Sequence, residues 1–421
     1  MAGGRNGCLR LLQQRLAGIR RPQRAAAQTA PEDPAIARGG CSSTLRRSPS
    51  DPTCPGRLRA PQSSLPEESA MRTVIRGTGM HLPANVVDNR RLSLLMETSD
   101  EWIQQRSGII TRHYAARDEA TSDLAVPAAE RALSDARIGL EEVDYVVFAT
   151  MTPDYYFPGS GPLFQKKLGL GRAPCLDIRQ QCAGFLFGLQ VADAILRSGQ
   201  HRTVLLVGAE VHVCFMPWWS WDVVEGKSDR RVEAREYEWN SRFRDRAVLF
   251  GDAAGAFVLQ AEEEDGVGLL DVMVRSDGSC AEAMHVRAGG SAFRPYFEPR
   301  MFERGDTVPV VEGREVFRTA VTIMPEAVEE ILRRNGLALE DLDLLLMHQA
   351  NLRINEAVQK RLGLPDSKVF NNIQKYGNTT AATLPLAFHE AKAERGLPAG
   401  SLVCFVALGS GLSWGAALYR C

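Results

Sequence analysis

The sequence lacks the patterns that mark several other classes of protein. Its nine cysteines form no C-x-x-C pair and its seven histidines form no H-x-x-x-H pair, which argues against a metal site and against a disulfide framework. No run approaches the roughly 18 apolar residues of a membrane span, so we expect a soluble chain. The 50 basic and 51 acidic residues nearly balance, which gives no reason to expect nucleic acid as a partner. Scattered cysteines suit a reducing compartment, and we expect the cytoplasm.

The first 70 residues differ in composition from the rest. They hold 11 arginines, eight prolines and no lysine. Such a segment buries too little apolar area to fold, so we expect residues 1–70 to be disordered. Three explanations stay open: an organellar transit peptide, a plain tail, or synthesis that starts at Met71. We favour the third, because the globular pattern begins abruptly at Thr73-Val-Ile-Arg-Gly-Thr-Gly.

From Met71 onward, apolar strands alternate with amphipathic helices, which is typical of an α/β fold with parallel strands and helices on both faces. Two echoes indicate an internal duplication: Gly139-Leu-Glu-Glu-Val-Asp returns as Gly336-Leu-Ala-Leu-Glu-Asp, and Gln165-Lys-Lys-Leu-Gly-Leu as Gln359-Lys-Arg-Leu-Gly-Leu. We therefore expect two like halves, residues 71–262 and 263–421, with a tryptophan-rich insertion at about 215–246. The same register matches a helix that begins at Cys182 with one that begins at Asn378. If the two halves pack about a pseudo-twofold axis, these two helix starts can face each other.

Cys182 follows a predicted short buried strand, 174–178, and precedes a predicted helix, 184–198. The positive end of a helix favours the thiolate, whereas apolar surroundings raise the thiol pKa. A neighbouring histidine would have to decide between these effects. The alternative is an inert core cysteine.

Three further groups follow predicted strands, where ligands bind in open α/β sheets: His348, Asn378 and the turn Gly409-Ser410-Gly411. Taken singly, they fit a core histidine, a helix cap and a plain turn. Together with Cys182 they fit thioester chemistry, in which the thiolate takes an acyl group. His348 and Asn378 could then donate hydrogen bonds to a second thioester as its carboxylate leaves as CO2, and the turn could bind an oxyanion. This chemistry requires no metal or cofactor.

Several segments strongly resemble beta-ketoacyl-acyl-carrier-protein synthase III: Thr98-Ser-Asp-Glu-Trp102-Ile, Cys182-Ala-Gly-Phe, Phe250-Gly-Asp-Ala-Ala-Gly-Ala, His348-Gln-Ala-Asn-Leu-Arg353 and Tyr376-Gly-Asn378-Thr. The resemblance implies a thiolase-like fold of duplicated α/β halves in five layers (αβαβα) and a homodimer. It also implies the activity, which is condensation of an acyl-CoA primer with malonyl-acyl carrier protein to start fatty acid or related polyketide synthesis.

The resemblance further assigns roles to matching positions. Cys182 is implied as the acylated nucleophile, His348 and Asn378 as the decarboxylation pair, and the backbone N–H groups of Cys182 and Ser410 as the oxyanion hole. The other implied positions are Trp102 and Arg106 for the CoA nucleotide, Phe317 for pantetheine, Phe157 for the partner subunit's acyl pocket, and Arg318, Arg353, Lys360 and Arg361 for the carrier protein.

The sequence departs from the family pattern in four places: Ser410 for a common glycine, Arg314 for a common asparagine, and enlargements at 215–246 and 289–310. These departures leave acetyl, branched, longer and aromatic primers open. Two other functions also stay open: an acyltransferase or non-decarboxylating Claisen enzyme on the same fold, and a non-catalytic scaffold subunit.

Overall fold

The computed structural model describes residues 71–263 and 266–421, so the predictions for residues 1–70 lie outside the described part of the chain. Two five-stranded sheets dominate it, in the orders β1-β7-β6-β4-β5 and β12-β11-β13-β14-β8. The strands of the first sheet are β1 (Arg72–His81), β7 (Ala253–Glu262), β6 (Thr203–Glu210), β4 (Tyr145–Ala149) and β5 (Cys175–Ile178). Those of the second are β12 (Val369–Phe370), β11 (Leu344–Met347), β13 (Leu402–Gly409), β14 (Ser413–Arg420) and β8 (Gly268–Ser276).

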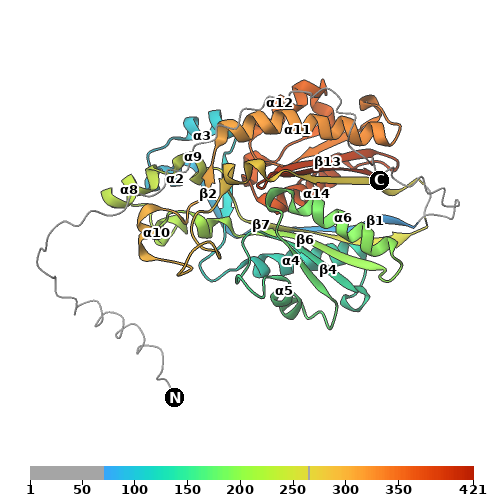
Figure 1. Cartoon of the computed structure of the whole chain (residues 1–421), viewed down its shortest axis with the longest axis horizontal. Coiled ribbons are helices and arrows are strands. Elements are labelled where there is room, and N and C mark those ends of the chain that lie inside the picture. The colour runs from blue at the N-terminus through green and yellow to red at the C-terminus, as the bar shows by residue number, and fades with distance from the viewer. Residues whose placement is uncertain (1–70, 264–265) are drawn as a thin grey trace, which may run out of the picture. The chain divides into compact units, whose positions relative to one another are not determined.

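Helices cover both sheets and fill the space between them (Figure 1). The outer helices are α4 (Thr121–Ala136) and α5 (Gly161–Leu168) on the first sheet, and α11 (Gly313–Arg334) and α12 (Leu352–Leu362) on the second. The central helices are α6 (Gly184–Arg197) and α14 (Thr383–Arg395). These are the five layers of the predicted thiolase-like fold. Helix α6 is apolar on several sides because sheets lie on both of its faces.

The sheets are mixed, which corrects the expectation of parallel strands throughout. Strand β4 runs parallel to β5 and β6, and β11 runs parallel to β12 and β13. The remaining pairs are antiparallel. For β13 and β14 the reason is the connection of three residues, since a parallel pair needs a crossover of a dozen or more.

Strand β5 was predicted to be buried, and this prediction is wrong. The strand forms one edge of the first sheet, and Leu176 at its centre is 38% exposed. An apolar edge strand and a central strand have the same sequence pattern, because hydrophobicity does not reveal where a strand lies in the sheet.

The two halves repeat at an offset of 199 residues. The 3-10 turns before β4 and β11 begin at Leu140 and Leu339, and β6 and β13 begin at Thr203 and Leu402. Even an uncommon backbone conformation recurs at this offset, since Gln181 has φ 45° and Thr380 has φ 49°. The boundary predicted at residue 262 stays a prediction.

This offset corrects the expected match of Cys182 with Asn378. Helix α14 begins at Thr383, after a 3-10 turn at Thr380–Ala382, so Ala381 is the counterpart of Cys182. The two turns nevertheless face each other, as expected. A Cβ atom placed on Gly208 would lie 2.5 Å from the carbonyl oxygen of Ala381, so only glycine permits this approach.

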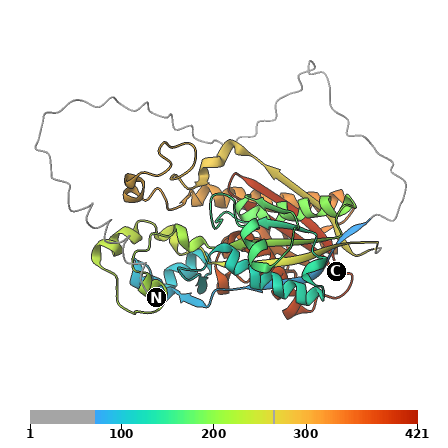
Figure 2. The same cartoon turned by 90° about the horizontal axis from the view of Figure 1, so that it is seen from below.

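The two enlargements lie at the same end of the molecule (Figures 1 and 2). The ring of Phe243 from the first enlargement packs over Gly305 of the second. Their helices are α7 (Trp221–Val224), α8 (Ala234–Ser241), α9 (Arg244–Ala247) and α10 (Pro299–Arg304). The other described elements are β2 (Asn85–Asp88), α2 (Asn89–Leu95), α3 (Asp100–Ser107), β3 (Thr111–Tyr114), β9 (Met284–His285), β10 (Val310–Val311) and α13 (Ile373–Tyr376).

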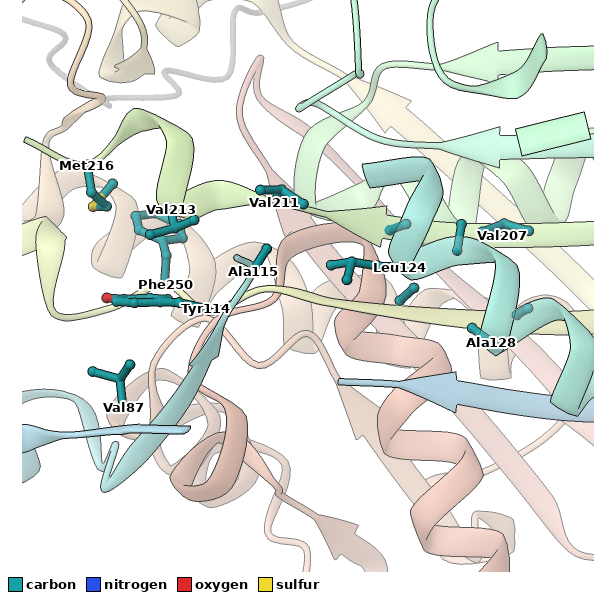
Figure 3. Close-up of a cluster of buried hydrophobic side chains, with 14 of the residues drawn as sticks. Val87, Tyr114, Ala115, Leu124, Ala128, Val207, Val211, Val213, Met216 and Phe250 are labelled. Carbon is teal, nitrogen blue, oxygen red and sulfur yellow. The ribbon is translucent and has the colours of Figure 1, made fainter. Parts of the chain in front are cut away.

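A large apolar cluster joins the first enlargement to the first sheet. Figure 3 shows part of it, including Val213, Met216 and Phe250. Trp218 is buried in the same cluster, whereas Trp219 is half exposed. Within residues 71–263 and 266–421, no helix is both long enough and apolar enough to cross a membrane.

Candidate active site

Cys182 lies in the 3-10 turn Gln181–Ala183, directly before the first residue of α6. The predicted position at a helix N-terminus is therefore confirmed. The side chain borders a cavity of about 650 Å³. Other residues of the cavity wall come from far along the chain and include Thr152, His212, Phe250, Thr380 and Ser410.

The thiol of Cys182 is held in its neutral form. Burial and, to a smaller extent, the Glu210 carboxylate raise its pKa to about 12, and the residue's own backbone N–H opposes them only in part. Desolvation thus outweighs the helix terminus in the balance that the sequence left open. Glu210 ends β6 and accepts hydrogen bonds from Met151 N at 3.0 Å and from Thr152 Oγ1 at 2.7 Å.

His348 directly follows β11, as predicted, and is buried. Its Nδ1 atom lies 2.7 Å from Thr383 Oγ1, and its Nε2 atom has no hydrogen-bond partner among the described residues. Burial lowers the pKa of His348 to about 3. The ring is therefore neutral at physiological pH, with one nitrogen protonated.

Asn378 has a fixed orientation. Its Oδ1 atom accepts a hydrogen bond from Thr380 N at 2.9 Å, and its backbone N–H donates to Leu249 O at 2.8 Å. Because the amide oxygen is occupied, the Nδ2 group can donate to a ligand.

The segment Asn378–Thr383 brings these groups together. Thr383 at one end binds the ring of His348, and Asn378 stands at the other end. Thr380, between them, shares the cavity wall with Cys182. The side chains of His348 and Asn378 do not themselves line this cavity. His348 and Asn378 thus converge on one turn, and Cys182 faces that turn from the 3-10 turn that precedes α6.

Ser410 also lines the cavity and begins the turn between β13 and β14. The preceding Gly409 packs against the cysteine: a Cβ atom there would lie 3.0 Å from Cys182 N and 2.9 Å from Ala183 N. In the described part of the chain, no carbonyl accepts a hydrogen bond from the N–H of Cys182 or Ser410. The Ser410 hydroxyl donates to Met284 O.

Trp102 lies between two arginines. The guanidinium carbon of Arg106 is 4.2 Å from the ring centroid, and that of Arg244 is 4.8 Å away. Arg106 comes from the same helix, α3, whose N-cap is Ser99. Arg244 comes from the first enlargement and was not predicted.

The other predicted residues are more scattered. Phe317 packs partly buried against the core beneath α11, outside the Cys182 cavity, and Phe157 is 82% exposed. The four basic residues, Arg318, Arg353, Lys360 and Arg361, are exposed on α11 and α12. Arg361 is already engaged, because it pairs with Glu326 and donates to Val321 O. Arg314 is exposed at the start of α11.

Sequence reasoning missed four residues of this site: Glu210, His212, Arg244 and Thr383. Glu210 carried a signal, since it is a carboxylate at the end of the otherwise apolar run of β6. Thr383 and Arg244 carried none, because their roles depend on contacts with residues distant in sequence.

Comparisons with known proteins agree with this geometry. The family model described as 3-oxoacyl-[acyl-carrier-protein] synthase III matches residues 176–224 and 232–278, and the model of its C-terminal part matches residues 332–421. The beta-ketoacyl-[acyl-carrier-protein] synthase III of Rhodospirillum centenum is 40% identical over 353 residues, which is 83% of this chain and 99% of that protein. That of Clostridium perfringens is 39% identical over 344 residues, 82% of this chain and 98% of that protein.

Solved structures show the same fold. The 3-oxoacyl-[acyl-carrier-protein] synthase III of Aquifex aeolicus has a TM-score of 0.70 at 36% identity and covers 83% of this chain and 100% of its own. A priming beta-ketosynthase of the R1128 polyketide pathway has a TM-score of 0.71 at 28% identity, and the match covers 85% of this chain and 98% of that one. Identity of this level over nearly the full length of the relatives shows that the chain belongs to the beta-ketoacyl-[acyl-carrier-protein] synthase III family.

Proposed function

We propose that this enzyme condenses an acyl-CoA primer with malonyl-acyl carrier protein, releasing CO2 and forming a 3-oxoacyl carrier protein. The observation that carries the proposal is the convergence of Cys182 with the segment Asn378–Thr383, which fixes both a neutral imidazole and an oriented amide. The activity starts fatty acid or related polyketide synthesis.

In the first step, the Cys182 sulfur attacks the thioester carbonyl of the primer. The N–H groups of Cys182 and Ser410, which no described carbonyl occupies, donate to the oxyanion that forms. The carbon–sulfur bond to CoA then breaks. CoA leaves as a thiol with the proton that Cys182 loses, and the acyl group remains on Cys182.

In the second step, the malonyl thioester binds with its carbonyl oxygen toward His348 Nε2 and Asn378 Nδ2. Both groups donate hydrogen bonds as CO2 leaves, which stabilises the enolate. The enolate carbon attacks the acyl carbon on Cys182, and the Cys182 thiolate that leaves takes a proton from solvent. No step needs a metal or a prosthetic group.

The surrounding residues suit the two carriers. Trp102, Arg106 and Arg244 offer an aromatic ring and two cations to the CoA nucleotide, and Phe317 is proposed beside the pantetheine. Arg318, Arg353 and Lys360 present charge to an acidic carrier protein. Arg361 has a smaller role than predicted, because Glu326 already binds it.

A homodimer is supported by the edge of the first sheet. Strand β5 leaves one side without a described neighbour, and an exposed apolar segment, Tyr155, Tyr156 and Phe157, lies close in sequence. Natural sheets seldom leave such an edge uncovered. Sedimentation of the parent chain should give a dimer, and a Phe157→Asp variant should weaken it.

The cytoplasm is the proposed location. Five cysteines of the described residues are free thiols, which suits a reducing compartment: Cys175, Cys182, Cys214, Cys404 and Cys421. Cell fractionation with an antibody to the chain tests this proposal.

Intact-protein mass spectrometry after incubation with a panel of acyl-CoAs tests the proposed function. The parent chain should gain one acyl group on Cys182, and Cys182→Ser should gain none. Asn378→Ala should still be acylated but should condense roughly a hundredfold more slowly, since one donor to the enolate is lost.

Three outcomes would contradict the proposal. Full condensation by either variant would rule out the assigned roles. Condensation without release of CO2 would favour the non-decarboxylating Claisen alternative. Absence of labelling by every acyl-CoA would favour a scaffold subunit.

A further inference from the structure

The wall of the Cys182 cavity contains two histidines, His212 and His285, which the proposed chemistry does not use, and His212 is the buried one. Its ring stacks on Phe250, with centroids 3.5 Å apart and an interplanar angle of 8°. The ring of Phe215 meets it edge-on at 5.6 Å and 73°. Both phenylalanines also line the cavity, so the imidazole is held in a fixed position within an aromatic wall.

One nitrogen of this ring has no hydrogen-bond partner in the part of the chain that the structure describes. His212 is 1% exposed, and its Nδ1 atom is buried without a hydrogen-bond partner among the described residues. Two other polar side chains of the same wall are occupied, whereas Thr380 Oγ1 is, like His212 Nδ1, buried without a hydrogen-bond partner among the described residues. Thr152 Oγ1 donates to Glu210 at 2.7 Å and accepts from Val211 N at 2.9 Å, and the Ser410 hydroxyl donates to Met284 O. His212 is therefore an unused hydrogen-bonding group in a largely apolar wall.

The surroundings also determine its charge. Burial lowers the pKa of His212 to about 3, against a smaller opposing effect of the residue's own backbone. The neutral ring offers one N–H donor and one acceptor nitrogen. Two buried carboxyl groups, Glu210 and Asp252, lie near this end of the cavity, since both raise the pKa of the wall residue Cys214. These groups offer no cation to a negatively charged ligand, and a neutral oxygen matches the neutral ring.

We propose that His212 forms a polar subsite of the acyl pocket, which selects a primer whose acyl chain carries an uncharged hydroxyl or keto oxygen. The inference rests on the proposed function, because it assigns this cavity to the acyl group that Cys182 receives. A hydrocarbon primer would leave the buried nitrogen unpaired. A hydroxyl group can donate to this nitrogen in one tautomer of the ring and accept from it in the other. Sites built to bind a polar group reject analogues that lack it more strongly than apolar pockets reject an added hydroxyl.

The test compares acyl-CoAs that differ only by exchange of a methyl for a hydroxyl group. One pair is 3-methylbutanoyl-CoA and 3-hydroxybutanoyl-CoA, and a deeper pair is hexanoyl-CoA and 5-hydroxypentanoyl-CoA. The rate at which each labels Cys182 of the full chain is followed by intact-protein mass spectrometry. In at least one pair the hydroxylated primer should label Cys182 about tenfold faster than its hydrocarbon partner. A tenfold ratio of rates corresponds to the net free energy of about one hydrogen bond.

His212→Phe keeps the stack on Phe250 and removes the nitrogens, so it should reverse this preference. Phe215→Leu, in the same wall, is the matched control. It should change the labelling rates of the hydroxylated and the hydrocarbon primer of a pair by the same factor. Faster labelling of the parent chain by both hydrocarbon primers would overturn the polar subsite while leaving the condensing function intact, and this result needs no variant to fold. A preference that His212→Phe retains would also overturn it. No labelling by any acyl-CoA would instead contradict the proposed function.

Discussion

The Nδ1 atom of His348 lies 2.7 Å from the Oγ1 atom of Thr383, and this contact decides which ring nitrogen carries the proton. The Thr383 hydroxyl can donate to His348 or to Thr380 O, which is 3.0 Å away. The proposed mechanism needs a donor at Nε2, so it requires that the hydroxyl donate to Nδ1 and that the proton of the neutral ring reside on Nε2.

Replacement of Thr383 by valine should therefore impair only the second step. Thr383→Val removes the hydroxyl at nearly constant volume and frees the ring to adopt either tautomer. Decarboxylation should slow by about tenfold to a hundredfold, while acylation of Cys182 changes little. Single-turnover assays of the two steps measure this split. Thr383→Ser retains the hydroxyl and should restore decarboxylation, and equal slowing of both steps in the valine variant would contradict a positioning role.

A methyl group on Gly409 should disable the oxyanion site without removing any proposed catalytic side chain. Its Cβ atom would lie 3.0 Å from Cys182 N and 2.9 Å from Ala183 N, which are both backbone atoms and cannot swing aside. Gly409→Ala should lower the rate of acylation by roughly a hundredfold. Gly171→Ala is a useful comparison, because no atom lies within 4 Å of its Cβ position and its backbone φ is not positive. Normal acylation by Gly409→Ala would show that the turn tolerates displacement.

Glu210 should make the chain less stable as the pH rises from about 4.5 to 7. Burial raises its pKa from 4.5 to about 7, so in this range the folded state binds more protons than the unfolded state. Stability is then lost with rising pH, by up to about 1.4 kcal/mol per pH unit. Relative to the parent chain, Glu210→Gln should become progressively more stable across this range. Urea unfolding at a series of pH values measures the slope.

His212 should have the opposite effect on stability. Burial lowers its pKa from 6.5 to about 3, so between these values the unfolded state binds more protons and stability rises with pH. His212→Phe removes this gain, and its stability relative to the parent chain should decline from pH 4.5 to 6.5. The stabilities of Glu210→Gln and His212→Phe, each relative to the parent chain, should thus change with pH in opposite directions. A change in the same direction would contradict both pKa shifts.

Removal of Arg244 should weaken the binding of acyl-CoA. The guanidinium group is 4.8 Å from the Trp102 ring centroid, and a cation–π contact of this kind contributes about 1 kcal/mol. Arg244→Ala should raise KM for acyl-CoA by about fivefold at an unchanged kcat. Arg235→Ala breaks a similar contact with Trp219, 5.8 Å away, and should leave KM unchanged. A fall in kcat at an unchanged KM would contradict a role of Arg244 in binding acyl-CoA.

Local sequence patterns were sufficient to locate much of the site. The apolar run before His348 and the helix after Cys182 both appear in the structure as predicted. These features depend on neighbouring residues, whose periodicity is visible in a single sequence. The duplication was visible for the same reason, although the predicted match for Cys182 was wrong.

The sequence by itself determined that Cys182 lies at the start of a helix and that His348 directly follows a strand. Only the tertiary structure decided that the Cys182 thiol is neutral, that Thr383 binds the imidazole, that Arg244 covers Trp102 and that β5 is an edge. Each of these depends on burial or on contact between segments far apart in the chain. Desolvation and long-range hydrogen bonds arise only when those segments pack, so no local pattern records them.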